Sequence, residues 1–164
     1  MRRALIVALV VLGGCLATDI DHAVEDVVAL HLVPSGGVEA CAQYTHEHDE
    51  LTECCGFETR YRVIDVDARG GLADSDRACS GNSGGQAAML GEAPLSDGGK
   101  LVFADSNLTR VDAGGATVWT VPSPFGHISA ASEDRDGYLY LARGPQVARV
   151  ALADGSVAWI SELR

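Results

Sequence analysis

The chain has 164 residues, of which 47% are hydrophobic and 21% are charged. This composition is typical of a folded globular protein and excludes a disordered chain. Lysine and arginine number 12 against 23 aspartates and glutamates, which gives a net charge of -11. Because so acidic a surface repels phosphate backbones, we expect no nucleic-acid partner. No apolar run reaches the ~20 residues of a membrane-spanning helix.

The N-terminus has the pattern of an export signal. Met1-Arg2-Arg3 is positively charged, and Ala4 to Leu12 is an apolar run that is too short to span a bilayer. The next residues, Leu12-Gly13-Gly14-Cys15, resemble the lipobox of bacterial lipoproteins. The resemblance implies cleavage before Cys15 and acylation of that cysteine. An ordinary secretory signal with a chance cysteine is the alternative.

This resemblance also implies where the protein resides. Residues 1–14 would be the signal peptide and residues 15–25 a polar tether. Several acyl chains on one residue hold a protein stably at a membrane, so membrane lipid is an expected partner through Cys15. Leu16 stands where lipoproteins retained at the inner membrane usually have Asp. We therefore expect the outer membrane of the bacterial cell envelope, facing the periplasm or the surface.

Export would place four further cysteines in an oxidising compartment, where disulfides persist. They are Cys41, Cys54, Cys55 and Cys79. A bond between the adjacent Cys54 and Cys55 would be strained, and neighbouring side chains of an extended chain point to opposite faces. We predict that each of these two cysteines bonds a different partner, one to Cys41 and the other to Cys79.

A metal site or free thiols are the alternatives for this cysteine-rich segment. His46 and His48 lie near Cys41, Cys54 and Cys55, and a His-x-His pair on a strand would place both imidazoles on one face. The spacing matches no established zinc module. We therefore expect the two histidines to lie in a solvated loop, and we predict no metal and no other cofactor.

The C-terminal half contains an internal repeat. Residues 97–119 and 136–159 share one order: an Asp-Gly turn, a strand, a short turn, a strand with Arg-Val, a Gly turn and a strand that ends at Trp. Trp119 and Trp159 close the two copies. A fourth strand is expected before each copy, over 86–91 and 127–132. Four antiparallel strands in about 40 residues form the unit of a β-propeller blade.

The pattern of residues 136–159, with its lead-in Pro124-Phe125-Gly126-His127-Ile128, resembles the repeats of PQQ-like and NHL-type propellers. The resemblance implies an all-β fold of antiparallel, four-stranded, blade-like repeats, an incomplete β-propeller. Residues 95–164 would form two such repeats, in which Trp119 and Trp159 fill the gaps between blades. Residues 26–94 would form a disulfide-linked, loop-rich β region with degenerate blades.

The number of blades raises a difficulty, because the families that this chain resembles close with six to eight of them. About 150 residues at about 40 for each blade allow fewer than four. An open array exposes a hydrophobic blade face and a bare strand edge. The sequence leaves three explanations open: a fragment of a longer protein, a partner that covers the open end, or a cap formed by residues 41–80.

Gly81-Asn82-Ser83-Gly84-Gly85 matches the nucleophile-elbow pattern, but no strand pattern precedes it, so we predict no catalytic residue. The expected function is a lipid-anchored, non-enzymatic binding or scaffold module with a possible protein partner in the envelope. One alternative is an enzyme, either a fragment of a larger propeller enzyme or a small serine hydrolase that uses Ser83. The other is a metal-handling envelope protein that uses His46 and His48.

Overall fold

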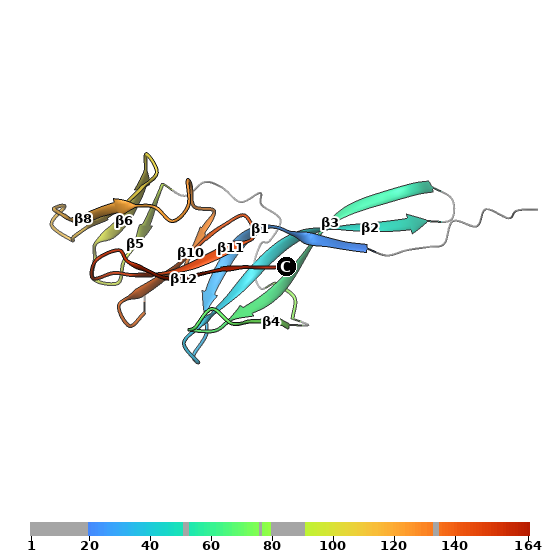
Figure 1. The fold of residues 1–164 in the computed structure, drawn as a ribbon, viewed down its shortest axis with the longest axis horizontal. Coiled ribbons are helices and arrows are strands. Elements are labelled where there is room, and N and C mark those ends of the chain that lie inside the picture. The colour runs from blue at the N-terminus through green and yellow to red at the C-terminus, as the bar shows by residue number, and fades with distance from the viewer. Residues whose placement is uncertain (1–19, 51–52, 76, 80–90, 133–134) are drawn as a thin grey trace, which may run out of the picture.

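The computed structural model describes residues 20–50, 53–75, 77–79, 91–132 and 135–164, with the side chains of 48–50 and 53–55 left out. The described residues form three four-stranded antiparallel sheets, which Figure 1 shows side by side. Sheet 1 contains β1 (Ile20–Leu32), β2 (Val38–Glu50), β3 (Glu53–Val66) and β4 (Leu72–Ser75). Sheet 2 contains β5 (Glu92–Pro94), β6 (Lys100–Ala104), β7 (Asn107–Val111) and β8 (Thr117–Pro122). Sheet 3 contains β9 (Ala130–Ala131), β10 (Tyr138–Arg143), β11 (Gln146–Ala151) and β12 (Val157–Glu162).

Within each sheet, strands that are consecutive in sequence are neighbours, so each sheet is a simple meander like a propeller blade. The predicted fold class, all-β with antiparallel four-stranded repeats, is therefore confirmed. The two copies of the repeat form most of sheets 2 and 3. Upstream of the repeat, the hairpins β1–β2 and β3–β4 belong to one sheet, where degenerate blades were expected.

The last hairpin turn has the same backbone feature in all three sheets. Gly70, Gly115 and Gly155 adopt positive φ angles of 85°, 87° and 76° in these turns. Glycine reaches this left-handed region without the steric cost that a Cβ brings. These three glycines therefore mark equivalent turns, and the sheets can be compared through them.

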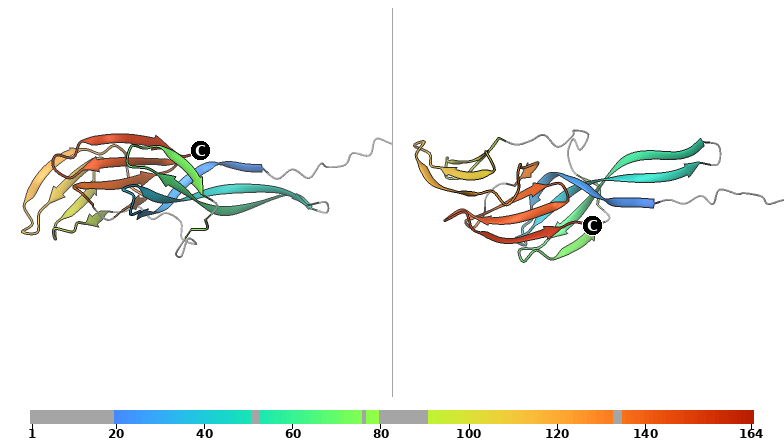
Figure 2. Two further views of the ribbon diagram at one scale, coloured as in Figure 1. Left: turned by 90° about the horizontal axis from the view of Figure 1, so that it is seen from below. Right: turned by 45° about the horizontal axis from the view of Figure 1, so that its top comes forward.

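The sheets stack in the order sheet 2, sheet 3, sheet 1, which differs from their order along the chain. One buried cluster joins sheets 2 and 3 and contains Leu101, Leu108, Leu139 and Leu141. The other joins sheets 3 and 1 through residues such as Val27, Val38, Ile64, Tyr140 and Val147. The first sheet thus packs against the last sheet, as Figure 2 shows in two further views.

The element boundaries differ from the predicted ones in two places. β1 begins at Ile20, so residues 20–25, expected in the tether, are the start of a strand. β5 takes Glu92–Pro94 into the second sheet, ahead of the predicted boundary at residue 95. The predicted first strand of that repeat, 86–91, lies outside the described residues except for Gly91. No helix in the described part of the chain is long and apolar enough to cross a membrane.

Sheet 1 extends beyond the stack as a three-stranded arm, which we define as residues 20–23, 45–50 and 53–59 (Figure 1). β4 pairs only with residues 63–66 of β3, so it does not reach the arm. The side chains of Val24 and Val27, which follow in β1, already belong to the buried cluster between sheets 1 and 3. The arm is therefore the part of sheet 1 that has no sheet stacked against it.

Candidate functional site

The contact of sheet 2 with sheet 3 centres on Trp119 and Arg110, which are paired across β7 and β8. The Trp119 indole donates a 2.9 Å hydrogen bond to the carbonyl oxygen of Leu152, and the Arg110 guanidinium donates one of 2.7 Å to the same oxygen. An added Cβ on Gly155 would come within 3.1 Å of the Trp119 ring. The indole therefore lies close against the turn, and this approach requires glycine at position 155.

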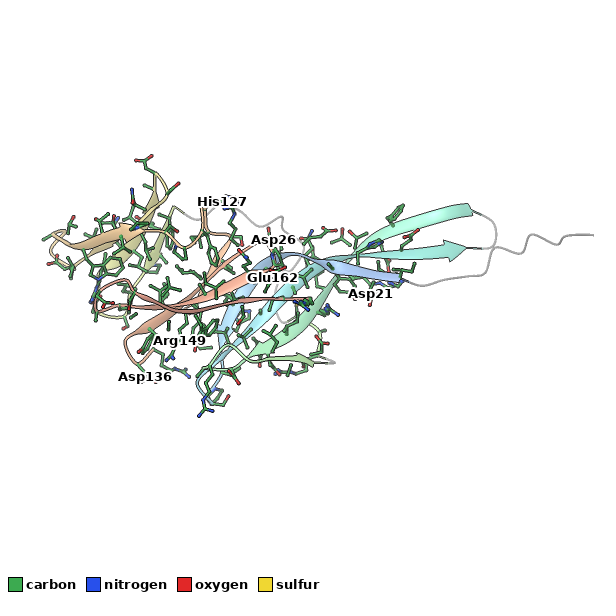
Figure 3. The ribbon with its side chains drawn as sticks, viewed as in Figure 1. Asp21, Asp26, His127, Asp136, Arg149 and Glu162 are labelled. Carbon is green, nitrogen blue, oxygen red and sulfur yellow. A yellow bond between two sulfur atoms is a disulfide. The ribbon has the colours of Figure 1, made fainter. Side chains whose placement is uncertain are left out.

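The contact of sheet 3 with sheet 1 repeats this arrangement. Trp159 and Arg149 are paired across β11 and β12, and both donate to the carbonyl oxygen of Ala68, over 3.0 and 3.2 Å. Gly70 lies under the Trp159 ring as Gly155 lies under that of Trp119. The Arg149 guanidinium also covers the Tyr138 ring at 3.7 Å. Figure 3 labels Arg149 in this part of the stack.

The outward face of sheet 2 mixes polar and apolar side chains, because Val102 and Val111 share it with Thr109 and Lys100. Thr109 and Thr120 share a 3.0 Å hydrogen bond there, and Lys100 pairs with Glu92 at 2.6 Å. Gly115, the third of the equivalent glycines, has open space where the other two meet a tryptophan. This end of the stack therefore carries several polar groups and has no tryptophan at its glycine turn.

The outward face of sheet 1 carries no tryptophan in the described residues. Asp65 and Ala73 are paired there in the place that Arg149 and Trp159 have in sheet 3. The segment 77–79 crosses this face instead. Arg77 pairs with Glu39 at 2.5 Å and with Asp65 at 2.6 Å. These two acidic neighbours raise the pKa of Arg77 above its ordinary value, the hydrogen bond to Glu39 being the larger cause.

A disulfide between Cys41 and Cys79 fixes the same segment to sheet 1. This bond corrects the predicted pairing, in which Cys41 and Cys79 each had a partner among Cys54 and Cys55. The register of the β2–β3 hairpin explains the error, because Cys41 lies opposite Val63 in the stack. Cys54 and Cys55 come eight or more residues before Val63 in β3, which separates their backbone from that of Val63 by roughly 26 Å or more at 3.3 Å per residue.

We call residues 77–79 the cap. They lie over β2 and β3, and Arg77 and the disulfide hold them there. Beside the cap lies an open cavity of about 540 Å³ at the end of sheet 1. Its walls are the β1–β2 turn, the β3–β4 turn and Arg77; the residues that line it include Val33, Pro34, Gly37, Glu39, Asp65, Asp67, Leu72 and Ala73. Three turns or loops therefore meet around one opening.

The charged groups of this cavity are held in fixed positions. Asp67 accepts backbone hydrogen bonds from Gly71 and Arg69, which lower the pKa of its carboxyl, Gly71 contributing most. Arg77 holds Glu39 and Asp65. The described lining contains no histidine and no cysteine. Carboxylates that are already paired, next to apolar walls, suit the binding of a ligand better than acid–base chemistry.

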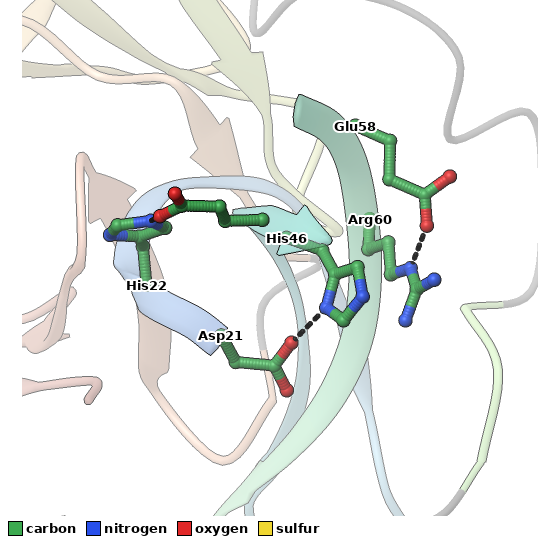
Figure 4. Close-up of polar contacts among 6 residues, drawn as sticks. Asp21, His22, His46, Glu58 and Arg60 are labelled. Atoms are coloured by element: carbon green, nitrogen blue, oxygen red, sulfur yellow. Dashed lines mark hydrogen bonds and ion pairs between the residues drawn. The ribbon is translucent and has the colours of Figure 1, made fainter. Parts of the chain in front are cut away.

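The predicted loop around His46 and His48 is a strand, since both residues belong to β2. This expectation was wrong. His46 is buried, with 6% of its surface exposed, and its Nδ1 lies 2.6 Å from a carboxylate oxygen of Asp21 (Figure 4). The side chain of His48 is not described. Among the described residues, no group of three His, Cys, Asp or Glu side chains is placed to hold a metal ion.

Two predicted residues, Cys15 and Ser83, lie outside the described residues. Arg77 is the functional candidate that sequence reasoning missed. Its signal was weak, a single arginine two residues before Cys79 in an acidic segment. Only the register of β2 and β3 brings its two carboxylate partners, Glu39 and Asp65, next to each other.

Comparisons with known proteins leave the family open. No family model and no curated protein matches the chain. Among solved structures, the crystal structure of Myxococcus xanthus glutaminyl cyclase aligns with 88% of this chain and 77% of that chain, at 15% sequence identity and a TM-score of 0.37. A likeness of this size does not establish a common fold, so neither the activity nor any residue of that enzyme is transferred to this chain.

Proposed function

We propose that this protein is a lipid-anchored, non-catalytic binding module of the bacterial cell envelope, attached through an acylated Cys15. The motif Leu12-Gly13-Gly14-Cys15 after a short apolar run supports the anchor. A disulfide between Cys41 and Cys79 is compatible with an exported protein, because such bonds persist in oxidising compartments. The stacked sheets would serve as a rigid support for loops, and loops on rigid supports commonly bind partners.

The observation that carries the proposal is the position of the cavity relative to the anchor. β1 runs from Ile20, five residues after Cys15, to Leu32, beside the turn that lines the cavity. Thirteen residues of strand at about 3.3 Å each give roughly 40 Å between these ends. Sheet 1 would therefore hold the cavity about 40 Å from Ile20, the described residue nearest the acylated cysteine in sequence, and leave it open to a partner in the envelope.

The anchor is tested by feeding bacteria that express the full chain with an alkyne analogue of palmitate. We expect the wild type to be labelled and the matched variant Cys15→Ser to be unlabelled and released from the membrane fraction. Equal labelling of both proteins, or none of the wild type, would contradict the anchor.

The binding role is tested by a photo-crosslinking amino acid at Ala73, which lines the cavity, with Thr120 on the outward face of sheet 2 as the control. We expect a discrete cross-linked protein from position 73 in intact cells and none from position 120. Identical patterns would contradict a binding site at the cavity. A serine-reactive probe that labels Ser83 would favour the hydrolase alternative instead.

A further inference from the structure

Two large apolar side chains are exposed together at the end of the arm. Ile20 and Phe57 are both opposite Glu47 in the register of the three strands. Residues that are directly opposite in neighbouring strands share one face of the sheet, so these two side chains lie on the same face, about 10 Å apart. Their exposed fractions are 47% and 65%, and Phe57 is the most exposed of the large hydrophobic residues described.

The position of this apolar pair relative to Cys15 identifies what covers it. Only residues 16–19 separate Cys15 from Ile20. A fully extended chain spans at most ~3.6 Å per residue, so Ile20 lies within about 18 Å of the acylated cysteine. Acyl chains on Cys15, as proposed above, would confine the end of the arm to the neighbourhood of the lipid surface.

Glu47, which lies between the two apolar residues in the register, is paired with a histidine. Glu47 Oε2 lies 3.2 Å from Nε2 of His22, a neighbour on the arm that Figure 4 shows. Glu47 is the charged residue that the register places between Ile20 and Phe57 on this face. Asp21 and Glu58 lie on the opposite face, where Asp21 pairs with His46 and Glu58 with Arg60. Figure 3 labels Asp21 at this end of the molecule.

We propose that Ile20 and Phe57 rest on the lipid surface that holds Cys15, so that the arm stands on the membrane and carries the stacked sheets above it. This inference rests on the proposed lipid anchor. The lipid is a zwitterionic one, because the chain carries a net charge of -11 and anionic headgroups repel it over about a Debye length. The apolar pair supplies the contact, and the net negative charge of the protein disfavours anionic headgroups.

The test uses the acylated full chain reconstituted in vesicles of zwitterionic lipid that carry bromine on their acyl chains, which quench tryptophan at short range. Phe57→Trp places the probe on the arm. Val118→Trp is the matched control, because Val118 is 49% exposed and lies at the far end of the stack, on β8. The wild type, with Trp119 and Trp159 between the sheets, gives the background signal.

We expect quenching of the Phe57→Trp probe several times stronger than that of the Val118→Trp probe. Adding Ile20→Ser, or replacing a third of the lipid by an anionic one, should reduce it. Equal quenching at the two positions in a protein that palmitate labels would overturn the inference and leave the anchor intact. Stronger quenching with anionic lipid, or a Phe57-dependent dimer in place of quenching, would also overturn it. An unlabelled protein would overturn both proposals.

Discussion

Sheets 1 and 3 differ in what packs against the equivalent face of each sheet. Sheet 3 turns Arg149 and Trp159 toward its neighbour, and both donate to one carbonyl oxygen of sheet 1. Sheet 1 has Asp65 and Ala73 in the corresponding pair, and the cap covers that face with Arg77 and a disulfide. The same meander can therefore continue a stack or end it, and two residues of the sheet together with a short covering segment make the difference.

The comparison explains how fewer than four sheets form a stack with few bare apolar surfaces. One outer face is crossed by the cap, and the other carries polar groups among its valines, including the Thr109–Thr120 hydrogen bond and the Lys100–Glu92 pair. The predicted cap of residues 41–80 is not what the described residues show, because most of that segment forms β2, β3 and β4 of sheet 1 itself and residues 77–79 alone cross its outer face. Polar outer faces are also what terminal units of repeat proteins need for solubility.

The largest expected effect comes from removing the side chain that joins sheets 3 and 1. Trp159→Ala would lose a large aromatic contact and the hydrogen bond to Ala68, and we expect it to lower the free energy of unfolding by about 3 kcal/mol. Urea unfolding measures this loss. The control Ile160→Ala, at a side chain that is 49% exposed, should change it by less than about 0.5 kcal/mol. Equal effects would show that Trp159 does not join the sheets.

The second largest expected effect on the free energy of unfolding comes from the disulfide of the cap. Replacing Cys41 and Cys79 together by Ala opens a loop of 38 residues, and we expect a loss of roughly 2–4 kcal/mol in urea unfolding. Peptide mapping of the unreduced protein should recover the Cys41 and Cys79 peptides as one linked species. A linked species that contains Cys41 and either Cys54 or Cys55 would contradict the pairing.

A matched pair of glycine substitutions separates packing from backbone strain. Gly155→Ala and Gly115→Ala both place a Cβ at a positive φ, but only Gly155 lies against Trp119, while Gly115 has open space. Strain alone costs about 1–2 kcal/mol, so both variants should lose that much. We expect Gly155→Ala to lose about 1 kcal/mol more, because its methyl group displaces the indole. Equal losses in thermal unfolding would contradict the close contact.

The smallest expected effect is on the stability of the protein at acidic pH. Backbone hydrogen bonds lower the pKa of Asp67 and of Asp154 below the ordinary value of 3.8, so the folded protein binds these protons less readily than the unfolded chain. Their contribution to stability is therefore present above about pH 4 and is lost as the pH falls through the lowered folded values. Asp67→Asn should flatten the pH dependence of the urea midpoint below pH 4. An unchanged slope would show that the carboxylate is not held by Gly71 and Arg69.

The sequence predicted those features that depend on local patterns. Alternating side chains and Asp-Gly or Gly-Gly turns determined the strands of sheets 2 and 3, and the 40-residue spacing of Trp119 and Trp159 identified them as a repeat. The packing of sheet 1 against sheet 3 joins segments about a hundred residues apart, as in the hydrogen bond from Tyr140 to Gly36. No local pattern specifies such a contact.

The candidate site was harder to predict for the same reason. Reasoning from neighbouring cysteines gave the wrong disulfide, because the pairing depends on the register of β2 with β3 and not on distance along the chain. The cavity and Arg77 were missed, since their residues come from three separate turns or loops. His46 was expected in a solvated loop because its spacing matches no zinc module, yet it lies on a strand that continues past the stack into the arm.

The central claim is that equivalent glycine turns of neighbouring sheets receive the two tryptophans, and proton–proton contacts measured by NMR test it most directly. The account predicts contacts between the Trp119 ring and the α-protons of Gly155, and between the Trp159 ring and those of Gly70, with no aromatic contact at Gly115. A Trp159 ring with no contact to Gly70 would show that the first and last sheets do not stack and would contradict the account.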